Sequence, residues 1–452
     1  MKKKQVISLS LFIAVILIGF LVYSVYSINR LERSVRDIKS KNEALRKTIE
    51  RLRAENKRLK LISDCNKIEK KVEKIRGLHA KKSIDYEMIE KKSLRKMLDQ
   101  KFNEAYPGTT FEYMESAFKI LGILQPDIDM KNLVMRLYDE QVAAFYDYVN
   151  KKLYMVDSSL YTPSIRDMFL AHELTHMLQD QHYDLIGMGI DDNSNDDRSM
   201  ALSSLLEGDA TRCMTIYYTK NAGLSVFLDV ALGVYMELKQ SEIDKAPAFL
   251  KETMLFPYMK GLVFVMALYE TQDQDTIHNV FLDPPVSTEQ IIHPEKYFAD
   301  RDDPVIPQLP CMKEFYESNG LVELYENTMG EFVMDIWLKS YISAGQARTA
   351  SEGWGGDRYK VFHHPSNTDL KGYVLQTNWD TPQDAQEFAG AYRSFLEKKY
   401  DIILDQSSDS VTSQYVLPND CHVHIKHADI TVTVVYASRS LFLDVLGLFE
   451  SD

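Results

Sequence analysis

The chain has 452 residues, of which 45% are hydrophobic and 26% are charged, and its formal net charge is −13. This length predicts more than one domain, and the ordinary globular composition argues against a disordered chain. The acidic balance predicts no nucleic-acid partner, because the basic side chains between Arg30 and Lys101 are interleaved with Glu and Asp. The four cysteines share no CxxC spacing, so they indicate no cysteine zinc site.

From Val6 to Ile28 the chain is almost entirely apolar, and its 23 residues carry no charge. A helix of this length spans about 34 Å, enough to cross a bilayer core of about 30 Å. Lys2 to Lys4 favour a cytoplasmic N-terminus, although three arginines follow the run closely. We therefore predict a single-pass anchor in the cell membrane over residues 1–28, with the rest outside the cytoplasm. The run is longer than the apolar core of a signal peptide, which disfavours the alternative of cleavage after Ser27.

The next segment, residues 29–65, follows a heptad repeat that begins at Ile28. Position a carries Ile or Val, with asparagine at two of the five places, and position d carries mainly Leu. The a residues are Ile28, Val35, Asn42, Ile49 and Asn56, and the d residues are Leu31, Ile38, Leu45, Leu52 and Leu59. This pattern predicts a coiled-coil stalk that forms a parallel homodimer. The alternative is a single long helix that packs on its own domain.

Residues 66–140 predict a helical pre-domain. Glu90–Asn103 and Phe111–Leu121 carry apolar residues at helical spacing, and a Pro-Gly pair separates them. Two short strands, Gln141–Phe145 and Leu153–Val156, are expected on either side of a turn.

A helix that begins at Pro163, with Thr162 as its N-cap, carries the most informative motif of the chain. His172 and His176 lie four residues apart, so their side chains share one helix face and can bind one zinc ion. Glu173 lies between them and is the candidate general base that activates a water molecule. The motif predicts a zinc-dependent hydrolase with one Zn²⁺ per chain.

A catalytic zinc needs a third protein ligand, and the sequence offers two candidates. Glu207 lies in a helical segment of apolar residues, Ser203–Tyr218, where an unpaired acid is costly. His182 continues an HExxHxxQxxH pattern, but the related metzincin pattern requires glycine where this chain has Gln179. We therefore expect His172, His176 and Glu207 to bind the metal. Asp209 and Asp180 are candidates for orienting the histidines.

Downstream, Pro257–Tyr269 predicts a buried helix, and residues 141–344 are expected to form the catalytic domain. From residue 345 onward the runs Tyr373–Gln376, Val411–Leu417 and Ile430–Tyr436 read as strands around a helix at Pro382–Lys398. We therefore predict that residues 345–452 form a small α+β domain. For the whole chain we predict an α+β fold that is mainly helical.

Several motifs together resemble a group of largely uncharacterised gluzincin-type, membrane-anchored zinc metallopeptidases. They are HELTHMLQDQ at 172–181, EGDAT at 207–211, FPY at 256–258 and PPVSTEQIIHPEKY at 284–297. The resemblance implies a zincin-like catalytic domain and Glu207 as third ligand. It also implies a substrate-binding strand ahead of the metal helix, for which Leu153–Val156 is the candidate, and His293 or Tyr297 as stabiliser of the oxyanion.

The resulting prediction is a membrane-anchored zinc endopeptidase that acts on a peptide or protein substrate. The alternatives are an aminopeptidase or amidase, and a catalytically inactive zincin-fold scaffold or binding protein of the cell envelope. The intact Glu173 speaks against an inactive descendant, because such a protein can lose its general base freely.

Overall fold

The computed structural model describes residues 2–141, 144–156, 162–222, 242–271, 273–403 and 412–450. The chain divides into two compact units, Met1–Asp64 and Cys65–Asp452. The described part of the chain is mostly helical (62%) with a β-sheet region near the C-terminus, which confirms the mainly helical α+β class.

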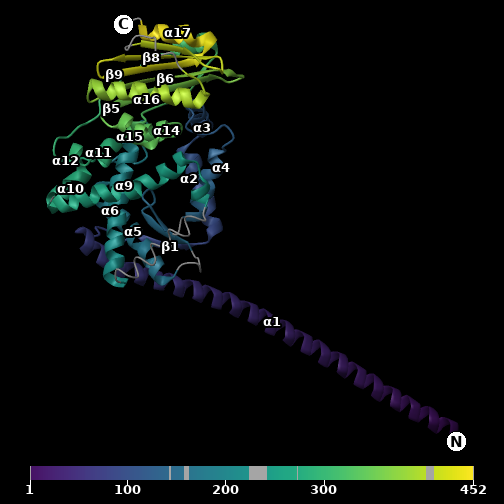
Figure 1. The fold of residues 1–452 in the computed structure, drawn as a ribbon. Helices are drawn as coiled ribbons and strands as arrows, with labels where there is room; N and C mark the ends of the chain where they lie inside the picture. The colour runs from purple at the N-terminus through teal and green to yellow at the C-terminus, as the bar shows by residue number, and fades with distance from the viewer. Residues whose placement is uncertain are drawn as a thin grey trace. The chain divides into compact units, whose positions relative to one another are not determined.

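The first unit is a single helical segment. It forms the greater part of α1 (Lys2–Arg76), which continues without a break into the second unit (Figure 1). Among the described residues α1 is the helix that is long and apolar enough to cross a membrane, and its apolar window is not buried. This agrees with a single-pass anchor, while the orientation across the membrane stays a prediction.

A small sheet lies early in the second unit. It consists of β1 (Asp85–Ile89), β2 (Ala144–Asp147) and β3 (Lys152–Val156), in the order β1-β3-β2. β1 runs parallel to β3, and β2 runs antiparallel to it. Two predictions are corrected here. Gln141 ends a helix instead of starting a strand, and the boundary at 140/141 divides a sheet, because β1 comes from the predicted helical pre-domain.

Helices α2, α3 and α4 complete this part of the chain. Their bounds are Lys91–Ala105, Thr110–Leu121 and Met130–Gln141.

The centre of the second unit is a group of three long helices. They are α5 (Pro163–Tyr183), α6 (Asp196–Ala222) and α9 (Ala248–Thr271). α6 and α9 cross at two glycines. A Cβ atom on Gly208 would lie 2.2 Å from the backbone of Gly261, and one on Gly261 would lie 2.0 Å from the Ser204 carbonyl oxygen. Both positions therefore require glycine, and this close crossing fixes where Glu207 lies relative to α9.

Pro257, predicted to begin a helix, lies inside α9. The shorter described helices between Glu242 and Asn319 are α8 (Glu242–Lys245), α10 (Gln274–Leu282), α11 (Thr288–Ile292), α12 (Glu295–Phe298) and α13 (Lys313–Asn319). Of these, α13 contributes Phe315 to the core of the second sheet.

Among the described residues a second sheet has six antiparallel strands in the order β4-β5-β6-β9-β8-β7. The strands are β4 (Val322–Asn327), β5 (Trp354–His364), β6 (Asn367–Trp379), β7 (Thr412–Val416), β8 (Cys421–Ala428) and β9 (Thr431–Ser438). The helices of this region are α14 (Gly330–Lys339), α15 (Ala344–Ser351), α16 (Pro382–Tyr400) and α17 (Arg439–Glu450). The predicted boundary at residue 345 is therefore late, since β4 already pairs with β5.

The second sheet is covered on both faces by helices, α16 on one and α17 on the other (Figure 1). Tyr373 of β6 points toward α16, where its hydroxyl bonds that of Tyr392 at 2.5 Å. The next residue, Val374, belongs to the core that includes Phe442 of α17. The alternation along β6 thus buries both faces of the strand.

Candidate metal centre

Two helices supply the predicted ligands. α5 begins as expected, because the Thr162 hydroxyl accepts a hydrogen bond from the Ile165 N–H at 3.4 Å and Pro163 opens the first turn. His172 and His176 lie one turn apart on the face of α5 that meets α6, with their ring centroids 4.7 Å apart. Glu207 lies on α6 opposite both rings.

The three side chains converge on one point. Glu207 Oε2 lies 3.0 Å from His172 Nε2 and 3.3 Å from His176 Nε2, and the two Nε2 atoms are 3.1 Å apart. Ligand atoms bound at 2.0–2.1 Å to a tetrahedral zinc ion lie about 3.3 Å from one another. The three atoms therefore have nearly the spacing that one tetrahedral ion requires.

The electrostatics of the cluster are dominated by the attraction between His176 and Glu207. Burial alone would lower the pKa of His176, but the carboxylate of Glu207 raises it to about 9. Burial would likewise raise the pKa of Glu207, but His176 and His172 hold it well below its usual range. In the metal-free cluster a proton on His176 thus neutralises the partly buried carboxylate of Glu207, and a metal cation can take the place of that proton.

A buried chain of hydrogen bonds orients His176 from behind. Its Nδ1 lies 2.8 Å from Gln179 Oε1, which can only accept, so Nδ1 carries the proton and donates. The Gln179 amide nitrogen donates to Asp209 Oδ2 at 2.9 Å and to the Leu206 carbonyl at 3.0 Å. This arrangement fixes the tautomer in which Nε2 offers its lone pair to a metal.

Arg76, at the end of α1, completes that chain. Its Nε donates to Asp209 Oδ2 at 2.5 Å, and the side chains of Arg76 and Asp209 are 2% and 0% exposed. The guanidinium also lies 4.6 Å from the ring centroid of Phe281. Asp209, expected to orient a histidine, therefore does so through Gln179 while Arg76 neutralises it.

Glu173 is held by the small sheet. Its Oε2 accepts a hydrogen bond from the Tyr146 N–H of β2 at 2.7 Å, and burial raises the pKa of its carboxyl group. Asp180, the second expected orienting residue, has a different role. It accepts hydrogen bonds from the Tyr146 hydroxyl and from Lys151 Nζ, both at 2.8 Å, so it fastens the β2–β3 hairpin to α5.

Three other candidates have their contacts elsewhere. His182 Nε2 bonds the His79 carbonyl oxygen at 2.8 Å, and His293 Nε2 pairs with Glu331 at 3.0 Å. The Tyr297 hydroxyl donates to the Asp283 carbonyl oxygen at 2.6 Å. None of these contacts involves the cluster of His172, His176 and Glu207.

Sequence reasoning missed three residues of this region: Arg76, Gln179 and Tyr258. The Tyr258 ring stacks on His172 at a centroid distance of 6.1 Å, and the residue is 41% exposed. Its place in the Phe-Pro-Tyr motif was the available signal. Gln179 was considered only as the residue that replaces a glycine, although it lies three residues after His176.

Comparisons with known proteins are sparse. Residues 320–446, the region of the second sheet, match a family described as a domain of unknown function (DUF8575). Curated proteins give no match. A crystal structure described as "a putative hydrolase with a novel fold from Chloroflexus aurantiacus" has a TM-score of 0.37 and 17% identity, covering 54% of this chain and 89% of that one. The function is therefore inferred from the site itself.

Proposed function

We propose that the chain is a membrane-anchored zinc-dependent endopeptidase of the gluzincin type, with a zincin-like catalytic region and one zinc ion per chain. The observation that carries the proposal is the convergence of His172 Nε2, His176 Nε2 and Glu207 Oε2 within 3.3 Å of one another. Glu173 directly follows His172 and precedes His176 by three residues, and it supplies the carboxylate that the chemistry needs.

Glu173 and Gln179 have different roles in the proposed reaction. Bound zinc supplies a Lewis acid that polarises the scissile carbonyl and makes water more acidic. Glu173 accepts the proton of the attacking water and delivers it to the leaving amine. Its raised pKa suits a group that both takes and gives a proton. Gln179 keeps His176 in the tautomer that binds metal.

The substrate-binding strand has to be reassigned. β3, which contains Leu153–Val156, is paired on both sides, by β1 and by β2, so it has no free edge for a substrate. Among the described strands β2 lies at the edge of this sheet, and the bond from the Tyr146 N–H to Glu173 shows that this edge lies beside α5. We therefore assign an extended substrate to the outer edge of β2.

A third candidate joins the two that the resemblance implies for the oxyanion. His293 pairs with Glu331 and Tyr297 donates to the Asp283 carbonyl oxygen. The Tyr258 ring stacks on His172 and the residue is partly exposed, so we propose its phenol as a further candidate donor to the substrate oxyanion.

Zinc content is the first measurement. The full-length protein in detergent should bind about one zinc per chain. Glu207→Ala should lose it, while His182→Ala, a control change on the helix of His172 and His176, should keep it. A folded wild-type protein without zinc, or zinc that survives Glu207→Ala, contradicts the site.

Activity then separates the candidate functions. The zinc-loaded protein should cleave peptides with blocked ends, and Glu173→Gln should keep zinc while losing about 10²- to 10⁴-fold in rate. Cleavage that requires a free N-terminal amine indicates an aminopeptidase. A cellular role that survives Glu173→Gln indicates a scaffold.

A further inference from the structure

The part of α1 between Asn29 and Lys60 exposes a regular apolar stripe. Every Val, Leu and Ile in this stretch occupies position a or d of the heptad repeat that starts at Ile28. The exposed fraction of these side chains ranges from 44% for Ile49 to 64% for Leu31. Side chains with this much exposed surface are not packed against another described part of the chain.

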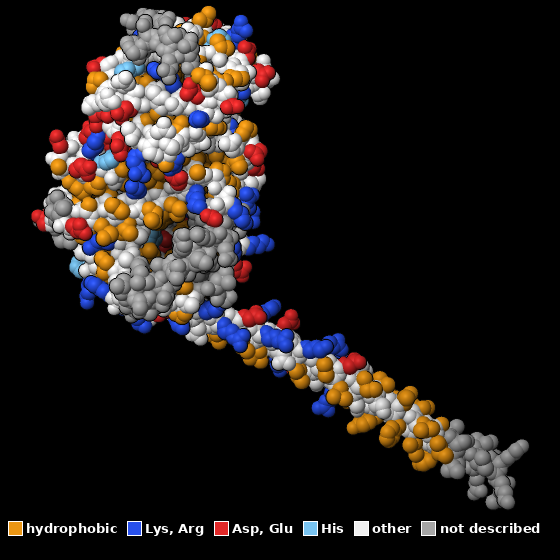
Figure 2. Space-filling view, viewed as in Figure 1, with side chains coloured by type: hydrophobic (Ala, Val, Ile, Leu, Met, Phe, Trp, Pro, Cys, Tyr) orange, Lys and Arg blue, Asp and Glu red, His pale blue; other side chains and the backbone are white. Residues whose placement is uncertain are grey.

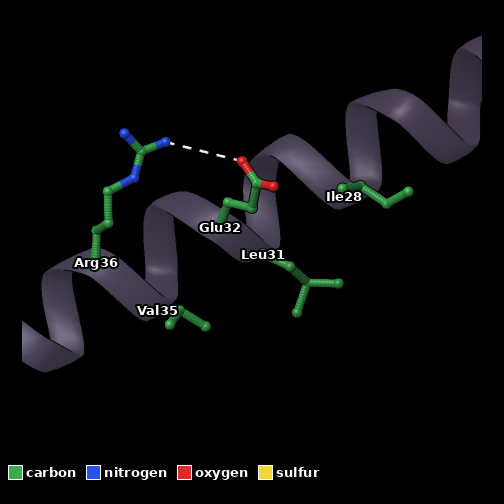
Figure 3. A pocket seen from close by; sticks show the side chains of 5 residues that line it. All are labelled: Ile28, Leu31, Glu32, Val35 and Arg36. Atoms are coloured by element: carbon green, nitrogen blue, oxygen red, sulfur yellow. Dashed lines mark ion pairs between the residues drawn. The ribbon is translucent and has the colours of Figure 1, made fainter.

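The stripe has a charged flank. Figure 3 shows Ile28, Leu31 and Val35 together along one side of the helix, with Glu32 and Arg36 beside them. The carboxylate and guanidinium of that pair are 3.9 Å apart, one turn from each other. Figure 2 shows charged side chains along one side of this helix and hydrophobic ones along the other. Such a helix presents a narrow apolar seam to a partner and keeps its remaining faces hydrated.

We propose that this seam, defined as the ten a and d residues from Ile28 to Leu59, binds the same seam of a second copy of this chain. The product is a parallel, two-stranded coiled coil. A spacing of 3.5 residues keeps the seam in register only if two helices wind around each other, and an identical helix offers the matching repeat. This inference is independent of the proposed peptidase activity.

The two asparagines select the parallel arrangement. In a parallel, in-register pair, Asn42 and Asn56 each face their own copy, so the two amides hydrogen-bond each other. An antiparallel pair aligned over the same stretch would place Asn42 opposite Leu45 and Asn56 opposite Leu31. Each buried amide would then lack a polar partner, which costs free energy. β-branched residues at a and mostly Leu at d favour two strands.

The flanking charges contribute little to partner choice. In the parallel pair Glu55 would face Lys60 of the other copy, which is attractive, and Lys41 would face Arg46, which is repulsive. Exposed ion pairs contribute only about 0.2–1 kcal/mol each. The seam therefore provides the association energy.

The test compares two double variants of the full-length protein in detergent, with the mass of the protein component measured by light scattering. Leu45→Glu with Leu52→Glu places charge at two d positions. Ala44→Glu with Ala54→Glu, the matched control, adds the same charge on outer faces of the same turns. The wild type and the control should be dimers, and the seam variant a monomer with unchanged helicity by circular dichroism. A monomeric wild type, a trimer, or a seam variant that stays dimeric overturns the proposal.

Cysteine cross-linking gives a second, register-sensitive readout. Val35→Cys should form an intermolecular disulfide under mild oxidation, because equivalent a positions face each other in a parallel pair. Arg36→Cys, one residue away at position b, should not, and the wild type with its four native cysteines gives the background. Equal yields for the two variants would contradict the seam.

Discussion

Two places in the second unit bring three potential metal ligands together, and they differ in what neutralises them. One is the cluster of His172, His176 and Glu207; the other is the acidic group of Glu289, Asp302 and Asp380. In both, the ligand atoms lie within 4.8 Å of one another among the described residues. Proximity of ligand atoms alone therefore does not distinguish them.

The acidic group already contains its cation. Lys296 Nζ lies 2.6 Å from Glu289, 3.1 Å from Asp302 and 2.5 Å from Asp380. Burial would lower the pKa of Lys296, but these carboxylates raise it. At the cluster of His172, His176 and Glu207 the nearby arginine, Arg76, lies behind Asp209 and Gln179, and its hydrogen bond goes to Asp209. The acidic group is closed by an internal ammonium group, whereas the cluster of His172, His176 and Glu207 leaves its carboxylate to a proton or a metal.

The largest expected effect comes from removing Arg76. Arg76→Met leaves Asp209 buried and unpaired, which should lower the free energy of unfolding by about 3–5 kcal/mol. Urea unfolding of the metal-free chain measures this change. Adding Asp209→Asn should restore most of the loss, because the buried charge is then gone. Arg36→Met, which removes an arginine paired at 3.9 Å on the exposed part of α1, should change little. Equal losses in the two single variants would contradict the buried pair.

Removing Lys296 should convert one kind of cluster toward the other. Lys296→Met leaves three carboxylates without a counter-charge, and we expect a loss of about 1–3 kcal/mol, since the group is partly exposed. Calcium should raise the urea midpoint of this variant and not that of the wild type, because oxygen ligands suit Ca²⁺. Lys251→Met, which breaks an exposed pair with Asp244, is the control. No response to calcium would show that the acidic group cannot be turned into a cation site.

The proposed zinc site should bind its metal more weakly when the supporting amide of Gln179 is removed. Gln179→Leu deletes the acceptor for His176 Nδ1 while keeping a similar volume, and the zinc affinity should fall about 10- to 100-fold. Gln181→Leu on the same helix loses bonds to the backbone of Lys81 and Lys82 and to Met177 Sδ, none of which involves the three ligands, and should keep the affinity. Competition with a chelator measures both. An unchanged affinity in Gln179→Leu would remove Gln179 from the site.

The predictable features are those that depend on a few residues close together in the sequence. The N-cap at Thr162, the helix with His172 and His176, and an acid in an apolar helix at Glu207 each follow from a few neighbouring residues. The small number of residues involved explains why spacing and chemistry were sufficient. The mainly helical class and the C-terminal sheet were likewise visible as periodicity.

What the sequence did not reveal depends on contacts between distant segments. Arg76 meets Asp209, 133 residues away, and in sequence it ends a helix rich in Lys and Arg that reads as solvated. β1 is a five-residue strand whose partner β3 lies more than sixty residues downstream, so its own pattern carries no sign of the pairing. The choice of β3 as the substrate-binding strand failed for the same reason, since only the sheet order shows that both of its edges are taken.

The smallest expected effect, counted as the change in unfolding free energy per pH unit, is the pH dependence of the metal-free cluster. In the folded chain the pKa of His176 is raised to about 9, whereas the ordinary value is 6.5. A raised histidine pKa means that the pair with Glu207 stabilises the fold fully below about pH 6.5 and that this contribution is lost as the pH rises through 9. The loss is at most about 1.4 kcal/mol per pH unit in that window.

Urea midpoints in EDTA from pH 6 to 10 should fall for the wild type and stay flatter for Glu207→Gln, which removes the partner charge. Burial raises the pKa of Glu289 in the acidic group to about 8, so that group adds a slope of its own, which is the same in the wild type and in Glu207→Gln and cancels when the two are compared. A wild-type profile as flat as that of Glu207→Gln would mean that the metal-free cluster is not held by this proton, and the contrast between the two places would then rest on geometry alone.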